Sequence, residues 1–110
     1  EHEGGEMHDH DDFDSFVASA SSVSNVPAFV DALKSVIGDH DILRLKGFVD
    51  VPGKPMRLIV QAVGSRIDSY FDRPWGKDEP RGTRLVVIGQ KGLDHNAVQS
   101  AVQSAAKAAA

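Results

Sequence analysis

The chain has 110 residues, 41% of them apolar, which suffices for one domain with a hydrophobic core and is too short for two domains of ordinary size. It has no run of about 18 apolar residues and no basic-then-apolar leader, so we expect a soluble, cytoplasmic chain with no membrane partner. The sequence contains no cysteine, which leaves imidazole, carboxylate or backbone oxygen to bind any metal. Because it begins at Glu1 rather than Met, we expect a piece cut from a longer protein.

Charge is distributed unevenly along the chain, whose formal net charge is -4. The first fourteen residues contain seven of the sixteen acidic residues and no Lys or Arg. The rest of the chain has 12 basic and 9 acidic residues, a balance of +3. The sequence therefore predicts an acidic leader in front of a mildly basic domain.

Residues 1–12 (EHEGGEMHDHDD) lack hydrophobic periodicity and are predicted to be a flexible linker before a domain at 13–110. In an extended chain His8 and His10 lie on the same side, and carboxylates flank them. Neutral imidazole with carboxylate suits Co(II), Ni(II) and Zn(II), while the lack of thiolate argues against a closed structural zinc site. The alternative is a solvated acidic linker that meets metal only incidentally, and no tightly bound cofactor is expected. The candidate metal ligands are His2, His8, Asp9, His10, Asp11 and Asp12.

The first two expected elements are a strand and a helix. Residues 13–21 combine aromatic and β-branched residues with small polar ones, which favours a strand. Residues 24–40 place apolar side chains at spacings of three, four and seven, which predicts a helix with one apolar face. Ser24 or Asn25 can cap its start, and Gly38 can end it in a left-handed conformation.

Three strands should follow as an antiparallel meander, because alternating apolar segments are separated by turn residues, Pro52-Gly53 and Gly64-Ser65. Residues Asp50–Gly53 also fit the short DxxG pattern of GTPase switches. A four-residue match is common by chance, and this one falls in a hairpin turn, so we interpret it as a turn. The expected strands are 42–51, 56–63 and 66–71.

A polar loop at 72–82 leads to an apolar strand at 83–89, and Asp94 can cap a final helix. The predicted order is therefore β-α-β-β-β-β-α. We expect an α+β fold, a two-layer sandwich in which two helices cover one face of a mostly antiparallel five-stranded sheet.

Four stretches have an order and spacing that are specific when taken together: ILRLKGFV, LIVQAVG, YFDRPW, and TRLVVIG followed by LD. With these stretches, residues 13–102 resemble the CobW C-terminal domain. The resemblance implies a branch of the P-loop GTPases that includes metal-insertion proteins. The DRPW and RLVVIG motifs are most similar to those of the cobalamin-biosynthesis members. Those members are implicated in cobalt delivery near the cobaltochelatase. A His-rich stretch before the C-terminal domain is also a feature of many members.

The chain departs from that family in one large respect. It has no GxxxxGK[ST] phosphate loop and no Cys-containing metal motif, and the resemblance places both in an N-terminal domain. The resemblance therefore implies that this chain is not an enzyme, that GTP and Mg bind only in the N-terminal GTPase domain of the parent, and that this domain and cobaltochelatase are its partners.

Two surfaces are candidates for the contact with the GTPase domain, because charge and an aromatic anchor are typical of polar inter-domain surfaces. They are the basic strand residues and the DRPW loop, in which packing of Trp75 against its own domain is favoured slightly over an interface. The alternative is a nucleic-acid-binding module in which basic residues with Phe48 and Tyr70 stack bases. The RNP sequence pattern of RNA-binding domains is absent, and the net charge of +3 after the acidic segment is modest. We therefore expect no nucleic-acid partner. The candidate interaction residues are Arg44, Lys46, Arg84, Arg73, Pro74 and Trp75.

Overall fold

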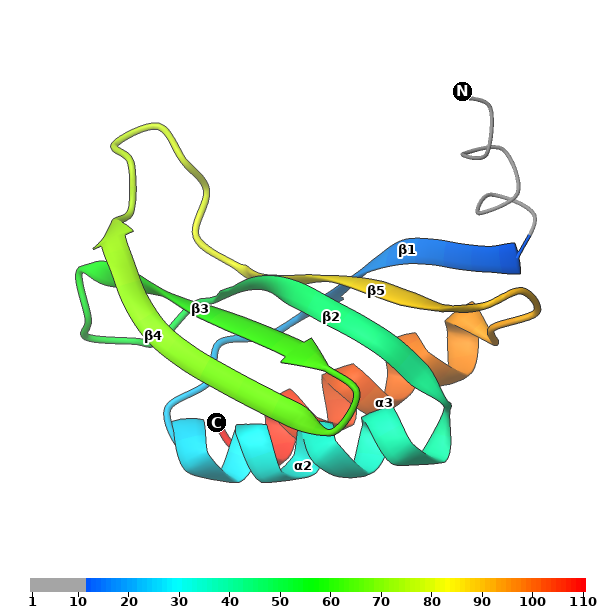
Figure 1. The fold of residues 1–110 in the computed structure, drawn as a ribbon. Helices are drawn as coiled ribbons and strands as arrows, with labels where there is room; N and C mark the ends of the chain where they lie inside the picture. Colours follow the sequence, from blue (N-terminus) through cyan, green and yellow to red (C-terminus); the bar gives the residue numbers. More distant parts are fainter. Residues whose placement is uncertain (1–11) are drawn as a thin grey trace, which may run out of the picture.

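The computed structural model describes residues 12–110 and has the predicted element order (Figure 1). A five-stranded sheet lies over two helices that both cover the same face, so the α+β two-layer prediction is confirmed. Neither helix of residues 12–110 is long and apolar enough to cross a membrane. The elements are β1 (Phe13–Ala20), α2 (Val26–Asp39), β2 (Ile42–Val49), β3 (Met56–Val63), β4 (Arg66–Pro74), β5 (Thr83–Gln90) and α3 (His95–Ala108).

The strand order in space is β1-β5-β2-β3-β4, and every neighbouring pair is antiparallel. The meander of β2, β3 and β4 is confirmed, with the turns placed where glycine is needed. Gly53 and Gly64 have positive φ angles of 81° and 59°, which L side chains rarely adopt. The last strand of the chain, β5, inserts between β1 and β2.

Strand β4 is longer than predicted, because it continues through Asp72, Arg73 and Pro74 instead of ending at Phe71. The register with β3 shifts between Arg57 and Leu58, so Asp72 is an extra residue in a bulge. Proline lacks an amide donor, and Pro74 is tolerated because β4 is an edge strand.

Helix α2 begins as predicted and ends later than predicted. Asn25 caps it, since its side chain accepts a hydrogen bond from the Ala28 amide at 3.1 Å. The expectation that Gly38 ends the helix is wrong: Gly38 lies inside α2, and His40 still donates its amide to the Val36 carbonyl. The left-handed residue is Asp41, with φ of 53°, because Asp is among the few non-glycine residues that tolerate that region.

Helix α3 protects the outer edge of β1. Asp94 caps the helix as predicted, accepting from the Ala97 amide at 3.0 Å. The Gln99 side chain accepts from the Ser19 amide at 2.9 Å and donates to the Ser19 carbonyl at 2.7 Å. This pairing satisfies backbone groups that an edge strand would otherwise leave open to another chain.

The core lies between the sheet and the helices. Alternate residues of the central strands point toward α2 and α3 and are buried, as in the Leu85 and Val87 pair of β5. Burial of these apolar side chains supplies the main driving force for folding. The largest fully buried side chains are Phe29, Leu33, Leu45, Leu85, Val23, Val49, Val60, Val87, Val98, Val102 and Thr83.

Candidate interaction surface

The face of the sheet opposite the helices is here called the open face. Within residues 12–110 no helix lies over it, and three of its apolar residues are accessible: Val17 is 55% exposed, Val63 62% and Val86 44%, while Ile59 is buried. Exposed apolar groups among charged ones are typical of an interaction surface. Cross-strand neighbours form three rows from β1 to β4: Ser19, Arg84, Phe48, Ile59 and Tyr70; Val17, Val86, Lys46, Gln61 and Asp68; Ser15, Ile88, Arg44, Val63 and Arg66.

The open face is basic. Arg44, Lys46, Arg66 and Arg84 all belong to its three rows, and none of them takes part in the ion pairs formed among residues 12–110. Asp68 is the single carboxylate in those rows. The predicted candidates Arg44, Lys46 and Arg84 are therefore brought to one surface, with Arg66 added from the edge strand β4.

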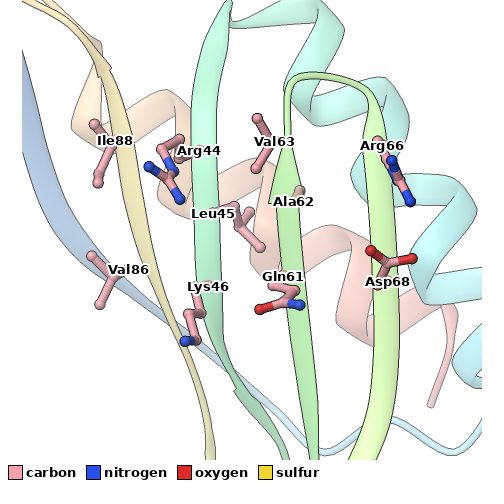
Figure 2. A pocket seen from close by; sticks show the side chains of 10 residues that line it. All are labelled: Arg44, Leu45, Lys46, Gln61, Ala62, Val63, Arg66, Asp68, Val86 and Ile88. Carbon is pink, nitrogen blue, oxygen red and sulfur yellow. The ribbon is translucent and has the colours of Figure 1, made fainter.

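An open groove of about 750 Å³ follows the middle of this face. Figure 2 shows its side chains rising from β5, β2, β3 and β4, with the helices behind the sheet. Arg44 and Lys46 stand between the apolar residues of β5 and those of β3. The groove therefore offers positive charge beside apolar walls, which is the chemistry that accepts an acidic segment with some apolar residues.

A second part of the site is a network of ion pairs that joins the end of β4, where the DRPW sequence begins, to the loop that follows it. We call it the DRPW network. Arg57 donates to the bulged Asp72 from Nε and Nη2, at 3.0 and 2.9 Å, and contacts Glu79 at 3.4 Å. Glu79 also accepts from Arg73 at 2.9 Å and from the Gly76 amide at 2.8 Å. The loop is thus fastened to β3 and β4 by charge-assisted hydrogen bonds.

The aromatic residues of this region pack on one another. The Trp75 and Phe48 rings meet edge to face with centroids 5.8 Å apart. The Arg57 guanidinium lies 4.5 Å from the Phe48 centroid, and that of Arg81 lies 5.4 Å from the Trp75 centroid. Arg81 is held by Asp50 at 2.9 Å. Packing of Trp75 against its own domain, the favoured prediction, is confirmed, while Arg73 and Pro74 stay exposed.

This packing bears on the nucleic-acid alternative. Stacking a base needs an uncovered aromatic ring. Phe48 is covered by Arg57 and Trp75, so of the two expected aromatic residues only Tyr70, 48% exposed, offers a free ring on the described part of the open face. Of these two residues, Tyr70 alone is therefore available to stack a base.

The DRPW network should give the domain a pH-dependent stability. Hydrogen bonds from Arg73 and the Gly76 amide lower the pKa of Glu79 from 4.5 to about 2, and Arg57 lowers the pKa of Asp72. A carboxyl whose pKa is lower in the folded state stabilises the fold above its unfolded pKa, and that contribution is lost as pH falls toward the folded pKa. We expect the urea midpoint to fall between pH 5 and pH 2, and to fall less steeply in Glu79→Gln.

The control for this prediction is Asp78→Asn, next in the chain, exposed and outside the ion pairs of residues 12–110. It should follow the parent profile. A Glu79→Gln profile as steep as the parent's would show that the ionised Glu79 side chain does not stabilise the fold.

The predicted metal ligands fall mostly outside the described residues: His2, His8, Asp9, His10 and Asp11. Asp12 is exposed, and its carbonyl accepts from the Lys91 amide at 3.0 Å. Within residues 12–110 no three His, Asp or Glu side chains are grouped so that they could hold a metal ion. His95 is at the start of α3, where it bonds to Asp14 at 2.8 Å and stacks on Phe16.

Sequence reasoning missed the partners of the DRPW loop. The sequence pattern predicts only a polar loop for Asp72, Glu79 and Arg81. In the structure, Glu79 accepts two hydrogen bonds from Arg73, six residues earlier. The one signal was the opposite charge of DRPW and DEPR within a short loop. That signal does not show which Arg pairs with which carboxylate.

The profile of the family described as "Cobalamin synthesis protein cobW C-terminal domain" matches residues 13–106. This match covers most of the chain, which therefore belongs to the CobW C-terminal domain family. It is 64% identical over 102 residues to a protein named zinc chaperone CobW from Sinorhizobium sp, covering 93% of this chain and 29% of that protein. A zinc chaperone CobW from Pseudomonas aeruginosa is 55% identical over 78 residues, 71% of this chain and 20% of that protein.

A solved structure shares the fold. The crystal structure of the Zn(II)-bound YjiA GTPase from E. coli superposes with a TM-score of 0.64 at 26% identity, over 86% of this chain and 30% of that chain. The chain thus spans less than a third of each of these relatives. Its sequence contains no GxxxxGK[ST] phosphate loop.

Proposed function

We propose that this chain is the interaction and regulatory domain of a GTP-dependent metallochaperone, with the His/Asp-rich linker at residues 1–12 gathering or handing over metal. The observation that carries the proposal is the match of 93% of the chain to 29% of a zinc chaperone, together with a basic face that no described element covers. The remaining length of such a relative has room for a GTPase domain, which we propose as the partner of the open face.

Zinc is the metal that the relatives' names support, because two are named zinc chaperones and one structure is Zn(II)-bound. The cobalt delivery and cobaltochelatase contact expected from the sequence remain proposals with less support. Imidazole and carboxylate ligands suit both Co(II) and Zn(II). GTP and Mg are proposed to bind in the partner domain alone.

A modest interface is enough for this function. Tethering by a linker gives an effective concentration on the order of millimolar, so the two domains can meet through weak contacts. Nucleotide can control the contact only if the GTP and GDP states bind the open face with different affinity. Arg44, Lys46 and Arg84 would then face acidic residues of the partner.

The test is hydrogen exchange on the longer protein that contains both domains, in GTP and GDP. We expect open-face amides of β2 and β3 to exchange several-fold more slowly in one nucleotide state than in the other. Arg44→Glu with Lys46→Glu should remove that difference, because charge reversal turns attraction into repulsion.

The matched control is Lys34→Glu, which reverses an exposed charge on α2 and should change nothing at the open face. Equal protection in both nucleotide states, unaltered by any of these substitutions, would show that the working surface lies elsewhere or that the domain is a passive appendage.

A further inference from the structure

The groove of the open face has unpaired positive charge and no occupant among residues 12–110. Its lining includes Arg44, Lys46 and Arg66, and the one acidic side chain in it is Asp68. Three cations so close together repel one another, and an anionic segment laid between them lowers that repulsion. Val63, Val86 and Ile88 also line the groove and can contact apolar atoms of the same segment.

The chain itself contains a segment of the complementary charge. Residues 1–11 have five acidic residues and no Lys or Arg, with Met7 as their one large apolar residue. We call residues 1–11 the leader. It is the most acidic stretch of the sequence, and it joins the domain at β1, an edge strand of the sheet that bears the groove.

The leader is long enough to reach every basic residue of the groove. Phe13 pairs with Gln90, one step beyond the row in which Ile88, Arg44, Val63 and Arg66 follow one another across the sheet. With neighbouring strands about 4.8 Å apart, β2 is about 10 Å and β4 about 19 Å from β1. Eleven extended residues span up to about 36 Å.

We propose that the acidic leader docks in the groove of the open face, with its carboxylates on Arg44, Lys46 and Arg66. Each exposed ion pair is weak, but the leader is tethered to the sheet edge at an effective concentration on the order of millimolar, so weak contacts suffice. Because occupant and groove belong to one chain, docking does not depend on a GTPase domain. The leader also competes with any domain that binds the same face.

The test uses the 110-residue chain with a nitroxide label on Gly5→Cys, since the sequence has no other cysteine. Paramagnetic relaxation of backbone amides then reports where the leader spends its time. Residues beside Phe13 are relaxed by tethering alone, so the diagnostic amides are those of Arg66 and Asp68 on the far strand β4. We expect their relaxation enhancement to be at least threefold that of amides in the middle of α2.

Two changes should remove the effect. Arg44→Glu with Lys46→Glu should bring the β4 enhancement down to the α2 level, and so should 1 M NaCl, which shortens the screening length to about 3 Å. Lys34→Glu on α2 is the matched control and should leave the enhancement unchanged. Enhancement that is equal on β4 and α2, or that survives charge reversal or salt, would overturn the proposal.

This experiment is independent of the proposed interaction with a GTPase domain. The labelled chain contains no such domain, so a negative result here leaves the inter-domain exchange experiment unaffected. Conversely, loss of the nucleotide-dependent exchange in the longer protein would not alter the relaxation pattern of this chain.

Discussion

Gly47→Ala should unfold this domain or destabilise it by about 3 kcal/mol or more, because backbone clashes exceed the usual cost of overpacking. Gly47 lies in β2 directly opposite Leu85 of β5. A Cβ at Gly47 would lie 2.7 Å from the Leu85 Cα and 2.9 Å from the Arg84 carbonyl carbon. These are backbone atoms, so relief requires the two central strands to separate and to lose hydrogen bonds worth about 1 kcal/mol each.

A glycine-to-alanine substitution in helix α2 should change the free energy of unfolding in the opposite direction. Gly38 lies inside α2 with no atom within 4 Å of an added Cβ. Gly38→Ala should therefore raise the free energy of unfolding by about 0.5 to 1 kcal/mol, since glycine loses more backbone freedom than alanine in a helix. Urea unfolding of both variants measures the difference. A Gly47→Ala domain as stable as the parent would show that β2 and β5 are not packed so closely.

Replacing His2, His8 and His10 together by alanine should weaken Zn(II) or Co(II) binding at least tenfold. The imidazoles are the only nitrogen ligands in the leader, and carboxylates alone hold these ions poorly. Binding by the parent chain should weaken as pH falls through the ordinary imidazole pKa of about 6.5, because protons compete with metal for the ring nitrogens. Titration calorimetry at pH 7.5 and pH 5.5 measures both effects.

The control is His40→Ala, which removes an imidazole at the C-terminal end of α2 and should leave metal binding as it is. The thermal stability of the triple variant without metal should equal that of the parent, because the three substitutions keep every carboxylate of the leader and change no residue of the described domain. If the triple variant bound metal as tightly as the parent did, the proposed metal role of the leader would be wrong.

The open face and the leader are related by charge, and this relation would connect the two proposed roles of the chain. Carboxylates such as Asp9 and Asp11 cannot serve a metal ion and Arg44 or Lys46 fully at the same time. Metal loading and docking are therefore expected to oppose each other. The groove would be free for another domain when the leader is occupied by metal.

The sequence by itself determined the features that depend on neighbouring residues. The order of strands and helices follows from hydrophobic periodicity, and the cap at Asp94 and the turns at Gly53 and Gly64 follow from the local chemistry of those residues. The basic residues of β2 were placed on one accessible face because side chains alternate along a strand. The end of α2 was misplaced, because Asp41 could take the conformation assigned to Gly38.

Only the tertiary structure decided which distant segments meet. The insertion of β5 between β1 and β2 places Gly47 against Leu85 and adds Arg84 to the basic face. The pairing of Arg57 with Asp72 and the edge-to-face contact of Phe48 with Trp75 join residues more than a dozen positions apart. Such contacts form because folding brings distant segments together to bury apolar surface and pair charges. A local sequence pattern does not determine which distant segments will meet.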